Sequence, residues 1–235
     1  MVTEDDLQND LVHANHILFS EGVLDAFGHV SARDTADPTK FYLARSMAPA
    51  LVQRGDIQCY DLQGEPLRAD SPPSYLERFI HSAIYQARPD VLAVVHSHSP
   101  SVIPFGVTGQ ALRPLYHMSS FLSCGCGQFE ISDKNGETDM LIRNPELGAQ
   151  LAECLGQGSL VLMRGHGSVV VGPSLRVAVF RAIYSEVNAK LQAQAAQLGT
   201  IRFLSDAEAT LADAANQGQV GRAWELWKSN VAFSD

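Results

Sequence analysis

Two apolar runs that end in histidine decide the fold: VLAVVHSH at residues 91–98 and SLVLMRGHG at residues 159–167. Each begins with a continuous apolar stretch, at 91–95 and 159–163, as expected for a strand buried on both faces. The second run passes through Arg164 to His166 and on to a further apolar stretch at 168–171. The sequence therefore predicts buried strands that bring histidines to their ends.

The segments on either side of these strands predict helices and short strands. Leucines at helical spacing indicate an amphipathic helix near the start, and β-rich pieces indicate strands at about 29–33, 41–44 and 57–61. We expect a helix over about 74–86, beginning near Pro72 and Pro73. Residues 119–127 are too irregular to assign and are a candidate loop over the site. The remaining helices are expected at the following ranges: 174–197 and 205–228.

Length and composition predict one globular domain over residues 1–235. Apolar residues make up 46% of the 235 residues and charged residues 18%, which is ordinary for a folded domain. The irregular alternation of strands and helices favours an α/β fold, layered around a central mixed sheet. A Rossmann domain and a P-loop are disfavoured, because their glycine motifs are absent from the sequence.

Charge and cysteine content limit the classes of partner. A net charge of −9 argues against nucleic acid and against an anionic membrane surface. The N-terminal segment has no signal-peptide pattern, and no apolar run approaches the length of a membrane span, so we expect a cytoplasmic protein. The four cysteines are interpreted as reduced thiols, and the pair Cys124 and Cys126 as small residues of a glycine-rich turn.

The histidines are the strongest candidates for metal ligands. His96 and His98 are two residues apart, so in an extended strand both imidazoles point to the same side. His166 is the natural third ligand, and three imidazoles leave coordination positions free for a substrate. The alternative for each histidine is a buried ring that is hydrogen-bonded to the backbone. Polar residues at the ends of apolar strands favour the metal site, because open α/β sheets bind ligands there.

Glu77 is the leading carboxylate. It shares a face of the predicted helix with His81. A helix that follows the two prolines could direct Glu77 toward the same pocket, where its carboxylate could ligate a metal or act as a general acid/base. The alternative is a solvated surface glutamate.

Four markers together resemble the class II aldolase/adducin family. They are Gly-His-Val-Ser at residues 28–31, Glu77 followed by Arg-Pro-Asp at 88–90, Ala-Val-Val-His-Ser-His at 93–98, and the pair His-Gly at 166–167. The resemblance covers about residues 7–191. It implies a three-layer α/β/α sandwich, assembled as a homotetramer with active sites at the subunit interfaces.

The resemblance also implies roles for individual residues. His96, His98 and His166 would bind a divalent metal ion, and Glu77 would be the acid/base or an exchangeable fourth ligand. Three imidazoles suit zinc, manganese, cobalt or iron, with zinc usual in the aldolases and manganese favoured in the decarboxylases.

Two departures from the aldolase pattern bear on the reaction. Sugar-phosphate aldolases typically have Asn where this chain has His29, and a tyrosine proton donor where the chain has His117 beside Tyr116. Both changes resemble the decarboxylase branch, which acts on ring carboxylates such as 3-hydroxy-2-methylpyridine-4,5-dicarboxylate and 3,4-dihydroxyphthalate. We therefore expect a metal-dependent carboxy-lyase of aromatic catabolism, in which Glu77, His29 or His117 protonates the ring carbon.

The second carboxylate of such a substrate requires its own contacts. Arg45, Ser46 and Arg164 are candidates, because arginine matches the geometry of a carboxylate with two parallel hydrogen bonds. The alternative for either arginine is a surface cation. Two other functions remain open: an aldolase or epimerase acting on a sugar phosphate or small hydroxy-acid, and a non-enzymatic interaction module like adducin.

Overall fold

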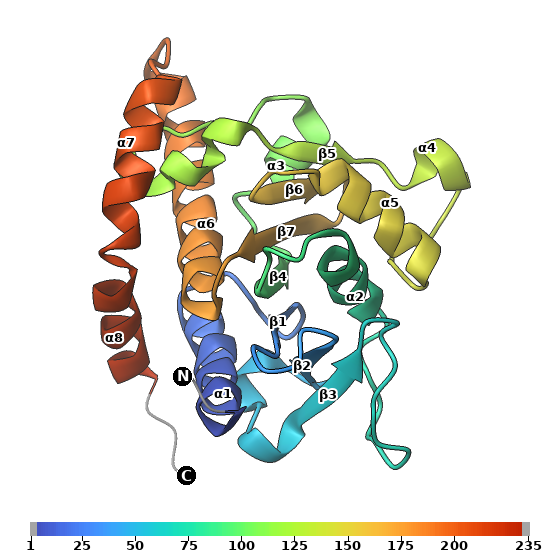
Figure 1. Cartoon of the computed structure of the whole chain (residues 1–235). Coiled ribbons are helices and arrows are strands. Elements are labelled where there is room, and N and C mark those ends of the chain that lie inside the picture. The colour runs from blue at the N-terminus through green and yellow to red at the C-terminus, as the bar shows by residue number, and fades with distance from the viewer. Residues whose placement is uncertain (1–3, 232–235) are drawn as a thin grey trace.

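A seven-stranded mixed sheet forms the centre of the chain (Figure 1), and the computed structural model describes residues 4–231. The strand order is β3-β2-β1-β4-β7-β6-β5, and every neighbouring pair is antiparallel except β5 and β6. The strands are β1 (His29–Arg33), β2 (Lys40–Ala44), β3 (Ile57–Asp61), β4 (Ala93–Ser97), β5 (Gly127–Phe129), β6 (Leu160–Met163) and β7 (Gly167–Gly172).

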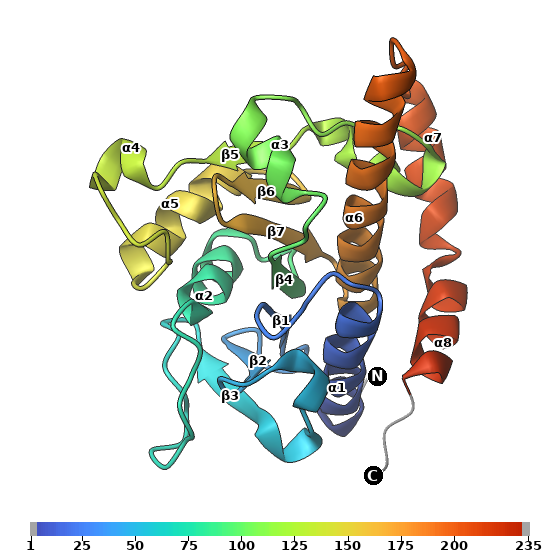
Figure 2. The same ribbon diagram turned by 180° about the vertical axis from the view of Figure 1, so that it is seen from behind.

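Helices cover both faces of the sheet, which confirms the expected α/β/α layering (Figures 1 and 2). One face packs against α1 (Glu4–Ser20) and α6 (Leu175–Leu198), and the opposite face against α2 (Arg78–Ala87) and α5 (Pro145–Leu155). The other helical elements are α3 (Ile103–Thr108), α4 (Ser132–Asn135), α7 (Asp206–Gln217), α8 (Val220–Asn230) and the 3-10 helices η1 (Pro49–Leu51), η2 (Arg54–Asp56) and η3 (His117–Cys124).

The central strands are buried on both sides, as their apolar runs predict. Neighbouring residues of β4 alternate between two apolar cores: Val95 packs in the core below α1 and α6, and Val94 in the core below α2 and α5. Because side chains alternate along a strand, His96 lies on the same face as Val94, toward α2. The layering thus places the histidine of β4 beside the N-terminus of α2. None of the helices in the described part of the chain is long and apolar enough to cross a membrane.

Several predicted boundaries were wrong. The strand expected at 91–95 is β4, which lies two residues later, so His96 lies inside a strand and not at its exit. The helix expected from residue 74 begins only at Arg78, after a turn at residues 76–77. The Pro73 carbonyl, which in a helix from residue 74 would accept from Glu77 N, accepts from Ser46 N instead. The single helix expected over 205–228 is two helices, α7 and α8, which meet at Gly218.

Four elements between residues 117 and 155 were not predicted: η3, β5, α4 and α5. The segment expected to be an irregular loop over the site forms η3 and β5, and η3 packs against α6 and α7. Helix α5 was missed although Asn144 caps its N-terminus by accepting from Leu147 N. α5 crosses α2 so closely that a Cβ on Gly148 would lie 2.5 Å from the carbonyl oxygen of Phe79.

Candidate metal centre and its cavity

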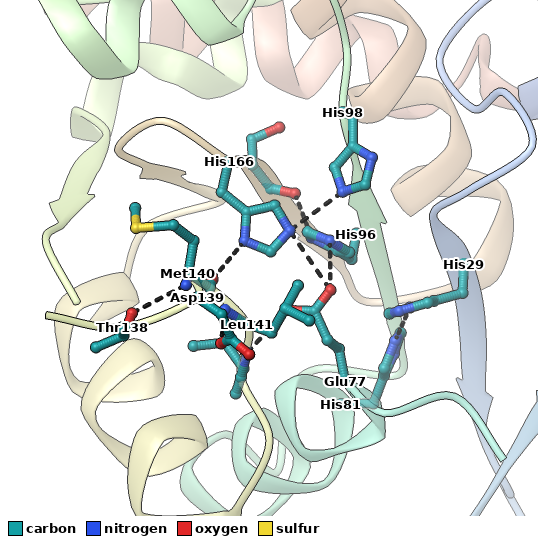
Figure 3. A network of polar contacts seen from close by, with 12 residues as sticks. His29, Glu77, His81, His96, His98, Thr138, Asp139, Met140, Leu141 and His166 are labelled. Atoms are coloured by element: carbon teal, nitrogen blue, oxygen red, sulfur yellow. Dashed lines mark hydrogen bonds and ion pairs between the residues drawn. The ribbon is translucent and has the colours of Figure 1, made fainter.

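Four side chains that the sequence singled out lie together: Glu77, His96, His98 and His166 (Figure 3). Each offers one ligand atom, and these atoms all lie within 4.8 Å of one another. Three imidazole nitrogens and one carboxylate oxygen are a donor set that suits zinc or another divalent first-row metal.

The pairing of β4 with β7 explains why residues so far apart in sequence meet. Ser97 pairs with Ser168, so the end of β4 lies beside the start of β7. The turn between β6 and β7 places His166 above this edge, and it requires glycine at position 165, where φ is +66°. Gly167 leaves the space in which His98 lies, because a Cβ there would be 3.1 Å from His98 Cδ2.

Backbone carbonyls determine which ring nitrogens face the centre. His96 Nδ1 lies 3.2 Å from the Ser168 carbonyl oxygen, and His166 Nδ1 lies 2.8 Å from that of Met140. A carbonyl only accepts, so each Nδ1 is the donor and each neutral ring keeps its lone pair on Nε2. His96 Nε2 is buried and has no hydrogen-bond partner among the described residues. The donor set therefore fits a cation, which would satisfy this buried lone pair.

One oxygen of the Glu77 carboxylate is hydrogen-bonded, and the other faces the ring nitrogens of the cluster. Oε1 accepts from Ile142 N at 2.9 Å, and Oε2 lies 3.4 Å from His166 Nε2 and 3.5 Å from His96 Nε2. Burial raises the pKa of Glu77, but the contacts with His166 and His96 outweigh it and hold the pKa well below its usual range. The carboxylate is therefore ionised.

The electrostatics of His98 and His166 differ. Burial, followed by the neighbouring charges of His96 and His166, lowers the pKa of His98 to about 4. Burial also lowers the pKa of His166, but the contact with Glu77 outweighs it, so that pKa is raised. His98 is therefore neutral near pH 7, as metal ligation requires.

A cavity of about 490 Å³ lies beside the cluster. Its polar lining comes from His29, Ser46, Tyr75, Glu77 and His98, and most of the remaining wall is apolar. A second cavity of about 590 Å³ lies near Arg113 and Gln192, and no residue of the cluster lines it. The first cavity is therefore the candidate substrate site, although the second is larger.

The structure brings Ser46 to this cavity but not the two candidate arginines. Arg45 donates from Nε to Asp56 Oδ1 at 2.7 Å, and Arg164 forms a two-point contact with Glu130. Neither arginine lines the cavity. In this arrangement both guanidinium groups are bound to carboxylates of the same chain.

Tyr116 and His117 lie apart from the cluster within one chain. His117 begins η3 and is exposed, and the Tyr116 ring lies 6.4 Å from the ring of Tyr184 on α6. Since α6 covers the face of the sheet opposite α2, these two side chains are on the other side from Glu77.

Sequence reasoning missed a buried polar chain behind the cavity. His29 Nδ1 lies 2.6 Å from His81 Nε2, His81 Nδ1 lies 2.6 Å from Ser31 Oγ, and Ser31 Oγ lies 2.7 Å from the Tyr85 hydroxyl. The available signals were the alternation of His29 with Ser31 in a strand and the spacing of His81 and Tyr85 on a helix. Segment 138–142, which contacts His166 and Glu77 through Met140 and Ile142, left no such signal.

Comparison with known families and proteins agrees with this architecture. The family model described as the class II aldolase and adducin N-terminal domain matches residues 9–193. The decarboxylase tropJ of Talaromyces stipitatus is 39% identical over 240 residues, which cover 92% of this chain and 90% of that protein. The 3,4-dihydroxyphthalate decarboxylase of Arthrobacter keyseri is 28% identical and covers 94% of this chain and 92% of its own.

The fold is also found in solved structures. The crystal structure of an aldolase II superfamily protein from Pseudomonas syringae superposes with a TM-score of 0.78 at 20% identity, over 96% of this chain and 92% of the other. At that identity the likeness concerns the fold alone.

Proposed function

The chain belongs to the class II aldolase and adducin family, and on this premise we propose that it is a metal-dependent decarboxylase of a hydroxylated aromatic or pyridine dicarboxylate. The observation that carries the proposal is the likeness to a decarboxylase at 39% identity over nine-tenths of the chain. A second relative is named for 3,4-dihydroxyphthalate, which is a hydroxylated ring with two carboxylates.

His96, His98 and His166 would hold the metal, and Glu77 would be a fourth ligand or the acid/base beside it. A divalent ion bound there supplies a Lewis acid, which withdraws electron density from substrate oxygens as the carbon–carbon bond breaks. Manganese and zinc are the leading candidates, and cobalt and iron also bind imidazole.

The side chains of the cavity would orient the ring and supply the proton. Phe27 and Leu141 provide apolar wall for the ring, and Ser46 and His29 offer polar groups for its carboxylate oxygens. Glu77 is our first candidate to deliver the proton that replaces the lost carboxylate, because its Oε2 faces the cluster while Oε1 is fixed by Ile142 N. Its carboxylate is ionised before substrate binds, so it would first take up that proton from the substrate hydroxyl or from water. Arg45 or Arg164 could bind the second carboxylate only after exchanging its present partner.

A role for Tyr116 or His117 as proton donor requires a second copy of the chain. In one chain both lie on the face of the sheet opposite Glu77. We therefore extend the proposal to a homo-oligomer, a tetramer or a multiple of it, in which η3 of one subunit reaches the cavity of another.

The test begins with the purified protein and elemental analysis of its metal content. We expect about one divalent ion per chain and release of carbon dioxide from 3,4-dihydroxyphthalate or 3-hydroxy-2-methylpyridine-4,5-dicarboxylate. His98→Ala should lose both metal and activity, whereas His13→Ala, a histidine of α1 outside the cluster, should lose neither.

Two other outcomes would replace the proposal. Production of an aldehyde from a phosphosugar such as L-fuculose 1-phosphate, without carbon dioxide release from any ring carboxylate, would identify an aldolase. Absence of metal binding and of any turnover would favour an adducin-like interaction module.

A further inference from the structure

The hydrogen-bonded chain His29–His81–Ser31–Tyr85 leads from the cavity into the protein interior. His81 and Ser31 have no exposed surface, Tyr85 is 1% exposed and His29 is 4% exposed. His29 also lines the cavity (Figure 3 shows its contact with His81). His81, Ser31 and Tyr85 are buried away from bulk water, so their polar hydrogens must be paired with donors and acceptors inside the protein.

Packing fixes the rings of His29, His81 and Tyr85 in place. The Phe41 ring stacks on His81 at an interplanar angle of 15°, and the Tyr75 ring lies 4.6 Å from the ring of His29. The guanidinium of Arg33 lies 4.7 Å from the centre of the Tyr85 ring. The donor and acceptor positions are therefore set by the core as well as by the hydrogen bonds.

The Tyr85 hydroxyl determines which atom donates in each of these hydrogen bonds. Burial raises the pKa of Tyr85 well above its usual value, so the hydroxyl keeps its hydrogen. Among the described residues, Ser31 Oγ is the one side-chain partner within hydrogen-bond distance of this hydroxyl. Tyr85 therefore donates to Ser31, because in the reverse order its buried hydrogen would have no acceptor.

The positions of the remaining hydrogens follow from the hydrogen bond that Tyr85 donates to Ser31. Ser31 uses its single hydrogen to donate to His81 Nδ1, which leaves the His81 hydrogen on Nε2, where it points at His29 Nδ1. Burial lowers the pKa of His81 to about 3, so this ring is neutral. His29 Nδ1 accepts the hydrogen of His81 Nε2 and therefore carries none of its own, so the His29 ring is neutral with its hydrogen on Nε2.

We infer that Tyr85, Ser31 and His81 are positioning residues that fix His29 as a neutral Nε2–H donor to an anionic oxygen of the substrate in the cavity. His29 is then a binding and specificity-determining residue, and not the proton source. The cavity supports this role, because among the described residues no arginine or lysine lines it, and an N–H donor at His29 can bind a carboxylate oxygen there.

This inference rests on the proposed function for the identity of its substrate, a hydroxylated ring carboxylate. The kinetic test is His29→Gln against His29→Leu, because the amide nitrogen of Gln reaches the position of Nε2 and donates but cannot deliver a proton. We expect His29→Leu to raise KM roughly 10- to 100-fold with little change in kcat, as for loss of a hydrogen bond to a charged group. His29→Gln should keep KM close to the wild-type value. If both variants instead lose kcat to the same extent, the inference is overturned.

His81→Phe tests the positioning role. Alone it should raise KM roughly as much as His29→Leu, because His29 Nδ1 loses the donor that fixes its tautomer. Combined with His29→Gln it should add little, since Gln has no tautomer to fix. If the double variant instead raises KM by the product of the two single effects, His81 acts only through the stability of the core, and the inference is refuted.

A readout without substrate separates this inference from the proposed function. Nitrogen-15 NMR of the metal-loaded protein should find the hydrogen of both His29 and His81 on Nε2, with the His29 signal identified by its absence in His29→Gln. Tyr85→Phe should populate the tautomer of His81 that carries its hydrogen on Nδ1. Tyr60→Phe is the matched control, because Tyr60 is also buried against Phe41 but donates to Ser74.

Hydrogen on Nδ1 of either ring in the wild-type protein would overturn the inference, whatever the protein catalyses. If both rings carry their hydrogen on Nε2 but no ring carboxylate is decarboxylated, the proposed function fails. His29 would then still be an Nε2–H donor, but to a different anionic ligand.

Discussion

Gly167→Ala offers a sharp test of how the strands build the metal centre. A Cβ at this position would lie 2.2 Å from the Ser97 carbonyl oxygen and 3.1 Å from His98 Cδ2. Real Cβ atoms do not approach other atoms below 3.0 Å, so the backbones of Ser97 and Gly167 must separate by about 0.8 Å to admit the methyl group. Since His98 follows Ser97 and His166 precedes Gly167, a metal ligand moves with either backbone.

Two separate costs follow from this movement. Overpacking a well-packed interior typically costs about 1–3 kcal/mol of stability. Displacing groups that orient a metal ligand typically costs about 10- to 100-fold in metal affinity. Gly167→Ala should therefore lower both the free energy of unfolding of the metal-free protein and its affinity for metal.

Gly172→Ala is the matched control, at the other end of the same strand. A Cβ there would lie 2.6 Å from the backbone nitrogen of Ala178, where α6 begins, and no residue of the metal cluster is among its near contacts. It should destabilise the fold by a similar amount and leave metal affinity unchanged.

Urea unfolding of the metal-free variants and competition with a chromophoric chelator measure the two quantities. If Gly167→Ala binds metal within twofold of Gly172→Ala, the packing of Gly167 against His98 does not position the ligand. The argument for the His-Gly pair would then be refuted.

Three further predictions concern the site and the fold around it. Glu77→Gln should keep the metal, because Gln still accepts from Ile142 N, but should lose roughly 100-fold or more in kcat if Glu77 is the acid/base; loss of metal in elemental analysis would identify a ligand instead. Because His81 has a pKa of about 3 when folded, below its unfolded value of 6.5, the unfolded state binds more protons between these values and stability falls as the pH is lowered below 6.5. The metal-free wild type should lose about 1.4 kcal/mol per pH unit more than His81→Phe between pH 5.5 and about 4.5, and parallel urea-unfolding profiles would contradict this. Asn216→Ala removes the hydrogen bonds from Nδ2 to the His117 carbonyl and Ser120 Oγ, so it should cost about 1–3 kcal/mol in urea unfolding, and a change below about 0.5 kcal/mol would show that α7 does not depend on this contact.

Local patterns predicted the central strands and the helices that pack on them with modest errors in their bounds. The apolar runs before His96 and before His166 identify β4 and β6, because a strand covered on both faces needs apolar side chains at every position. The end of a predicted helix is less certain, because contacts with other segments decide it. Helix α2 starts at Arg78 for this reason: the Pro73 carbonyl accepts from Ser46 N and not from a nitrogen of the helix.

The prediction that three histidines and Glu77 converge came from spacing and family resemblance, and the structure places them within 4.8 Å of one another. Spacing could not assign roles to Arg45 and Arg164, because a guanidinium binds whichever carboxylate the fold brings nearest. That partner is Asp56 for Arg45 and Glu130 for Arg164.

The sequence by itself determined which residues are available for metal chemistry, because His-x-His in a strand and a His-Gly turn act over a few residues. Only the tertiary structure decided which ring nitrogens face the centre and how His29 is oriented. Those properties depend on hydrogen bonds between residues 26 to 72 positions apart, from His166 to Met140, from His29 to His81 and from His96 to Ser168. Segments so far apart meet only through the pairing of strands and the packing of helices on them.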